Sequence, residues 1–183
     1  MKNIKGIIVY TTVVFLMSFV YFLFVKNVYS VGAERETFLS EIGEGLGGIG
    51  LWLLLFIYGR TLLKVSIGKG AIAQRIIPEY YYSPALPRLK RFLIFLNRTH
   101  SYVGIAAVVV IVLHVALVGL PMDILFFPLV LALVIWQGVC GFFITWRYAP
   151  KDLKKFSYLV HAQLLTGIMI GIFAYFGHIL VDN

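Results

Sequence analysis

Five long apolar stretches constrain the fold more than any other feature of this sequence. They cover residues 6–25, 46–67, 99–119, 124–146 and 156–180, and each has the roughly 20 residues that a helix needs to cross a bilayer. Together they use most of the 183 residues, of which 61% are hydrophobic. We therefore expect an all-α integral membrane bundle of five transmembrane helices, without a soluble catalytic domain or a nucleotide-binding loop.

The first stretch has some features of a secretory signal. Lys2 and Lys5 precede it, and "SVGA", ending at Ala33, resembles a cleavage site. The apolar run is longer than that of a signal peptide, so we expect an uncleaved first span. This span carries no ionisable group on its face, which predicts a peripheral position in the bundle.

The basic residues are unevenly distributed along the chain, whose net charge is +8. Every Lys and Arg except Lys26 and Arg35 lies in one of three segments or at the end of the second stretch: the N-terminus, residues 68–98, residues 147–155, and Arg60 with Lys64. The other side is acidic, with Glu34, Glu36, Glu41, Glu44, Asp123 and Asp182. Because basic residues concentrate in cytoplasmic loops, we expect a multi-pass protein of the cytoplasmic (inner) membrane with its N-terminus inside and its C-terminus outside. The basic loops suit lipid phosphates, and no nucleic acid partner is expected.

Two loop segments each have a functional and a structural interpretation. "PEYYYSP", residues 78–84, is either an interfacial aromatic belt, which we favour, or a stacking platform. "GAERETFLSEIGEG", residues 32–45, is either a solvated loop or an acidic docking surface for a basic partner.

All four histidines lie in the third and fifth stretches, where ionisable side chains are costly and usually face the bundle interior. These two spans are expected to run in the same direction, so His100 and His161 begin them on the cytoplasmic side, and His114 and His178 lie toward the outer side. His100 and His114 are 14 positions apart, which is ~21 Å of helix with a return to within ~40° in azimuth. The spacing predicts two histidine pairs at two depths.

Facing imidazoles are suited to hold haem iron from both sides of its plane. A mononuclear metal site needs ligands that converge at one depth. Arg98 and Arg60 are candidates for the anionic haem propionates, although orientation signals also explain them. Small residues leave space for a macrocycle or allow close helix packing: Gly104, Ala106, Ala107, Gly167, Gly171 and Gly177. The only cysteine, Cys140, excludes an internal disulfide, a multi-cysteine iron–sulfur site and a C-x-x-C-H haem motif.

The sequence resembles the ferric-reductase-like transmembrane domain superfamily, which includes NADPH oxidase membrane domains and the haem-binding subunit of methionine sulfoxide reductase systems. The resemblance covers about residues 44–180 and rests on "GLGGIGLWLLLFIYGR", "RTHSYVGIAAVVVIVLH" and "HAQLLTGIMIGIFAYFGH". It implies two haem b groups, one held by His100 with His161 and the other by His114 with His178. No internal repeat, low-complexity segment or long linker divides the sequence. We therefore expect a single membrane domain, with residues 1–43 as first span and outer loop and residues 44–183 as a four-helix haem-binding core.

The fifth span departs from the family pattern. His161 and His178 are 17 positions apart, which on an ideal helix leaves them ~100° apart in azimuth. Either a kink, π-bulge or unwound end near Gly171 or Gly177 restores the geometry, or His178 lies at the surface and ligates nothing.

These features predict a dihaem b-type cytochrome that relays electrons between a quinol pool or cytoplasmic-side donor and an outer-face redox protein such as a c-type cytochrome. It would be an electron-transfer subunit, part of a larger complex, with quinone as a further ligand. One alternative is a cytochrome b anchor subunit of a respiratory dehydrogenase or reductase, and a second is a transporter or proton pathway without haem.

Overall fold

A computed structural model describes residues 2–28, 38–67, 86–161 and 163–181, and all regular structure in these ranges is helical. The helices are α1 (Lys2–Val28), α2 (Phe38–Ile67), α4 (Leu86–Val118), α5 (Phe126–Thr145), α6 (Lys151–His161) and α7 (Leu164–Val181). All of them except α6 are long and apolar enough to cross a membrane. The predicted all-α membrane bundle with five spanning helices is therefore confirmed.

Local sequence explains where α4 begins and ends. Pro87 is the second residue of this helix, where a missing backbone N–H costs nothing. Gly119 follows the last residue with a φ of 97°, and its N–H donates to the Val115 carbonyl over 2.9 Å. Glycine adopts this left-handed backbone without a steric penalty, and Pro121 then prevents the helix from resuming.

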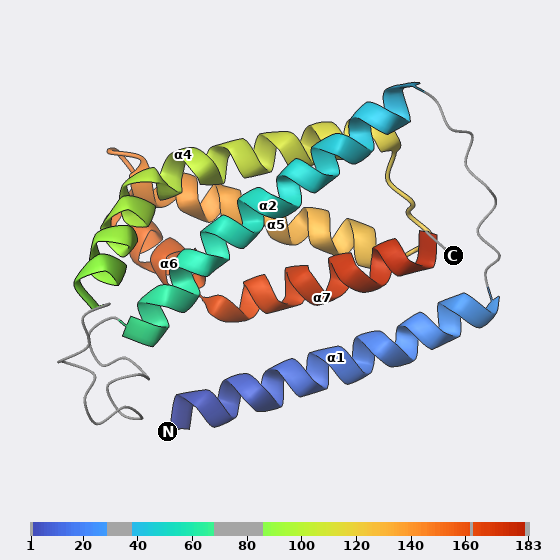
Figure 1. Cartoon of the computed structure of the whole chain (residues 1–183), viewed down its shortest axis with the longest axis horizontal. Coiled ribbons are helices and arrows are strands. Elements are labelled where there is room, and N and C mark those ends of the chain that lie inside the picture. Colours follow the sequence, from blue (N-terminus) through green and yellow to red (C-terminus); the bar gives the residue numbers. More distant parts are fainter. Residues whose placement is uncertain (1, 29–37, 68–85, 162, 182–183) are drawn as a thin grey trace.

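Two cytoplasmic loop assignments from the sequence were wrong in part. Residues 86–98 were expected in a loop but form the first turns of α4, and these turns swing away from the rest of the helix (Figure 1). The expected loop 147–155 likewise contains the start of α6. In both places hydrophobic residues between the charges give an amphipathic helix, which average hydropathy does not detect.

The helices form a bundle in which α2 lies against α4, α5 contacts α4 and α7, and α1 packs on α7 at the periphery (Figure 1). The peripheral position predicted for the first span is thus confirmed. Exposed Ile8, Val9 and Val20 lie on α1 and are suited to lipid.

Glycines let α2 approach α4 closely. A Cβ at Gly43 would lie 2.5 Å from Val118 Cγ2, and one at Gly50 would lie 3.0 Å from Ile111 Cγ1. Small residues at such positions are how membrane helices gain dispersion contacts, because lipid tails provide no hydrophobic drive for helices to associate.

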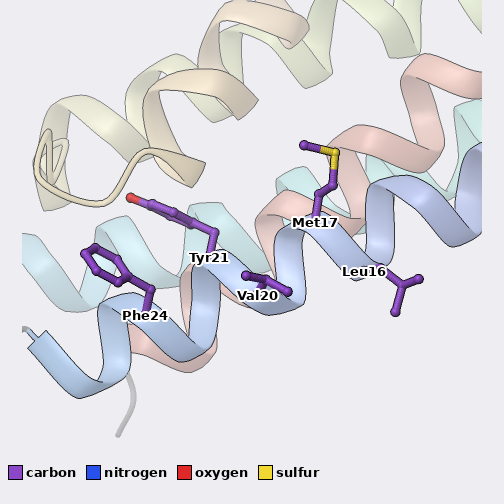
Figure 2. A pocket seen from close by; sticks show the side chains of 5 residues that line it. All are labelled: Leu16, Met17, Val20, Tyr21 and Phe24. Atoms are coloured by element: carbon purple, nitrogen blue, oxygen red, sulfur yellow. The ribbon is translucent and has the colours of Figure 1, made fainter.

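A cluster rich in aromatic side chains joins α1 to α7 and to the start of α5. It contains Phe22, Val25, Ile124, Phe126, Phe176 and Leu180. The Tyr21 hydroxyl accepts a 3.0 Å hydrogen bond from the Leu125 backbone N–H. Tyr21 also lines an open apolar groove on α1 with Leu16, Met17, Val20 and Phe24 (Figure 2). The groove holds no histidine, so it lies apart from the predicted sites.

The fifth apolar stretch is not one helix. It is divided into α6 and α7, and His161 is the last residue of α6 instead of lying near the start of a long span. The interruption lies between the end of α6 at His161 and the start of α7 at Leu164, and not near Gly171 or Gly177, which lie inside α7.

Charge separates toward the two ends of the bundle. One end of the bundle, which we call the basic end, holds the start of α1, the end of α2, the start of α4, and α6 (Figure 1). The opposite, acidic end holds the start of α2 with Glu41 and Glu44, and Asp123 before α5, with Lys26 as its described cation. The segment 78–84 and residues 32–37 of the acidic segment lie outside the described residues.

Candidate functional site: two facing histidine pairs

The structure brings together His100 of α4 and His161 of α6, the first pair predicted from the sequence. Their Nε2 atoms are 3.4 Å apart, and their ring centroids are 5.7 Å apart with the planes at 67°. The nitrogens are closer than the centroids by about 2.3 Å, or about two imidazole radii. The two Nε2 corners therefore point directly at each other. We call these residues the basic-end pair.

The structure also brings together the second predicted pair, His114 of α4 and His178 of α7, which we call the acidic-end pair. Their ring centroids are 6.4 Å apart and their planes differ by 17°. The His178 side chain is exposed and its ring meets Phe127 edge-on at 5.5 Å. His178 thus faces His114 although its side chain is exposed. Its position at the surface, which was the alternative, does not keep it away from its predicted partner.

The backbones that carry each pair stay apart. Among the described residues, no Cα of α4 lies within 8 Å of a Cα of α6 or α7, yet the histidines reach across this space. Gly104 lies on α4 between His100 and His114, and nothing lies within 4 Å of where its Cβ would be. The same is true of Gly171 on α7. A side chain at either glycine would thus contact nothing, and Gly171 is exposed, whereas Gly167 and Gly177 pack closely against Tyr58 and Phe127.

Three of the four imidazoles are oriented by backbone carbonyls. Nδ1 of His114 is 2.8 Å from the Gly43 carbonyl oxygen, Nδ1 of His161 is 3.0 Å from that of Gln137, and Nδ1 of His178 is 2.8 Å from that of Ala174. A carbonyl oxygen only accepts, so each Nδ1 carries the proton and donates it. In the neutral ring the lone pair then resides on Nε2, the tautomer of a histidine ready to bind a metal.

His100 differs from the other three because its Nδ1 is buried without a hydrogen-bond partner in the described structure. Its Nε2 donates toward His161 Nε2, but 3.4 Å is too long for a strong hydrogen bond. Gln137 Nε2 and Ser157 Oγ are buried without partners as well. Unsatisfied buried polar atoms are costly, and in native proteins they often mark a functional site.

Glycines on neighbouring helices make room for two of the rings. A Cβ at Gly47 of α2 would lie 2.9 Å from His114 Cε1, and one at Gly141 of α5 would lie 3.1 Å from His161 Cε1. Each imidazole therefore rests against backbone where any other residue would carry a side chain. Sequence reasoning missed both glycines, because nothing local distinguishes them from packing glycines.

Of the two predicted propionate partners, only Arg60 is anchored beside a histidine pair. Its Nε donates to Asn97 Oδ1 over 2.7 Å, which ties α2 to α4 one turn before His100. Because Asn97 lies one turn before His100, this bond places the Arg60 guanidinium beside the basic-end pair. Arg98 lies on the same turn of α4 as His100, with an exposed side chain. Asn97 was not singled out by the sequence, since its role depends on a residue 37 positions away.

The basic-end pair fits an iron held between two imidazoles. An imidazole–metal–imidazole link needs about 4 Å between the nitrogens, taking metal–nitrogen bonds of about 2.0–2.1 Å. The basic-end pair meets this after the rings separate by about 0.6 Å, and its Nε2 atoms already face each other. Among the described residues, no three His, Cys, Asp or Glu side chains gather as a metal site, so the histidines are brought together only in pairs.

The geometry stands without support from relatives. No protein-family model, no curated protein and no solved structure matches this chain.

Proposed function

We propose that this protein is a dihaem b-type cytochrome that transfers electrons across the cytoplasmic membrane. One observation carries the proposal: in each of two histidine pairs, a histidine of α4 faces a histidine of α6 or α7. Their α4 members lie 14 residues apart on one continuous helix, a rise of ~21 Å. Two one-electron centres so placed make a two-step relay through the membrane.

Each part of the site has a distinct role in this proposal. His100 with His161, and His114 with His178, would hold the two irons, and Arg60 and Arg98 would neutralise propionates at the basic end. Bound haem b supplies reversible one-electron chemistry, and two histidine ligands leave no open iron position for oxygen or substrate. The chain therefore serves electron transfer and not a bond-making reaction.

The charge distribution supports an orientation and a class of partner. Lys and Arg gather at the basic end, which supports a cytoplasmic location for this end and for the N-terminus. The exposed Glu41 and Glu44 at the opposite end suit a basic redox protein, such as a c-type cytochrome, on the outer face. A membrane quinol is the donor or acceptor on the other side of the relay.

Haem content of the purified protein tests the proposal. We expect a reduced-minus-oxidised spectrum of b type and two haems per chain by pyridine haemochrome. His100→Ala and His161→Ala should each lose the same haem, and the double variant should retain the other one. A wild-type protein without haem, expressed with haem available, would refute the proposal and favour a transporter. Stoichiometric co-purification with a dehydrogenase or reductase would instead favour the anchor-subunit function.

A further inference from the structure

The two histidine pairs differ in their electrostatic surroundings. Arg60 is held by Asn97, one turn of α4 before His100, and so lies beside the basic-end pair. The basic end also carries Lys64, Arg88, Lys90, Arg91, Arg98, Arg147, Lys151, Lys154 and Lys155. At the acidic end, Glu44 directly follows Gly43, whose carbonyl accepts from His114. Positive charge stabilises the reduced, less positive state of an iron centre, and negative charge stabilises the oxidised state.

The pairs also differ in how their imidazoles are hydrogen-bonded. Both members of the acidic-end pair donate from Nδ1 to a backbone carbonyl, His114 to Gly43 and His178 to Ala174. In the basic-end pair only His161 does so, to Gln137, while His100 Nδ1 has no partner. Donation from Nδ1 makes Nε2 a more basic ligand, which favours the ferric state. This second observation points in the same direction as the charges.

We infer that the two redox centres have unequal potentials by construction, with the basic-end pair the higher and Arg60 the main source of the difference. A single electron on the two centres then resides mainly at the basic end. Electron transfer is thermodynamically favourable from the acidic end to the basic end. This inference rests on the proposed function, because it concerns haem held by the two pairs.

Arg60 is better placed to act than the other cations. It lies within the α2–α4 contact, tied to Asn97, whereas Lys64 lies one turn further along α2 with its side chain exposed. Water and salt screen an exposed charge strongly, and a partly buried one much less. Lys64 therefore provides a matched control: the same helix, the same charge and nearly the same azimuth, at a solvated position.

Redox titration of the haem-loaded protein tests the inference. His114→Ala leaves the basic-end centre alone and His100→Ala leaves the acidic-end centre alone, so each potential can be assigned. We expect the centre retained in His114→Ala to have the higher midpoint potential, a test that needs no change at Arg60. Equal potentials, or the reverse order, would overturn the inference.

The source of the difference is tested with Arg60 variants in the His114→Ala background. Arg60→Gln should shift the reduction equilibrium about tenfold toward the oxidised state, about 59 mV for one electron. Arg60→Lys should retain most of the wild-type value, and Lys64→Gln should shift it far less than Arg60→Gln. Asn97→Ala keeps the Arg60 charge but removes the hydrogen bond that holds it. We therefore expect a smaller shift of the midpoint potential than in Arg60→Gln.

These outcomes separate two failures. A wild-type protein that binds no haem refutes the proposed function itself. If the protein binds two haems but their potentials do not respond to Arg60→Gln, or respond equally to Lys64→Gln, the proposed function stands and the role of Arg60 is refuted.

Discussion

The imidazole of His114 rests against the backbone of Gly47, where a Cβ would come within 2.9 Å of its Cε1 atom. A methyl group at this distance forces the ring or the helix to move, and the His114 ring is already held by the Gly43 carbonyl. We expect Gly47→Ala to weaken or abolish haem binding at the acidic-end pair and to leave the basic-end haem in place. Haem per chain and the reduced spectrum measure this.

The control lies next to it in the sequence. A Cβ at Gly48 has nothing within 4 Å, so Gly48→Ala should retain both haems. Because the two variants share the same change in helix propensity, equal haem loss in both would contradict the steric role of Gly47.

The contact between Gly141 and His161 predicts a graded effect at the other pair. A Cβ would lie 3.1 Å from His161 Cε1, a distance that a shift of a few tenths of an ångström relieves. Gly141→Ala should therefore keep the basic-end haem with an altered spectrum, and the bulkier Gly141→Val should lose it. An unchanged haem spectrum in Gly141→Val would show that the His161 ring does not need this position.

His178 should be equivalent to His114 despite its exposure. Since their rings face each other at 6.4 Å, His178→Ala should lose the same haem as His114→Ala, with no further loss in the double variant. Full haem content in His178→Ala would remove this residue from the ligands and leave the acidic-end pair without a function.

The packing of α7 on α2 is tested through Gly167. A Cβ there would overlap the Tyr58 ring, and overpacking of this kind costs about 1–3 kcal/mol. We expect Gly167→Ala to lower the midpoint of thermal unfolding in detergent. Gly171→Ala, on the same helix with nothing within 4 Å of the new methyl group, should change it little, and an equal loss in both would point to the helix and not to Tyr58.

Local patterns in the sequence were sufficient for the membrane class, the five spans and the pairing of the histidines. Hydropathy over about 20 residues reports burial in lipid directly, and the 14-residue interval within α4 sets the azimuth of His100 and His114 because that helix is continuous. The same rule was wrong for the fifth stretch. It assumed an unbroken helix between His161 and His178, whereas α6 ends at His161 and a separate helix, α7, begins at Leu164.

What the tertiary structure alone decided is how the helices meet. His178 of α7 faces His114 of α4, and the Gly47 and Gly141 backbones lie against the rings of His114 and His161. Arg60 acquires its position from Asn97, on a different helix. Each of these relations joins residues far apart in the chain, and helix period and hydropathy describe only neighbours within a few turns. The spans and the histidine positions predicted two pairs, and the packing of α2, α4, α5 and α7 sets what surrounds each pair.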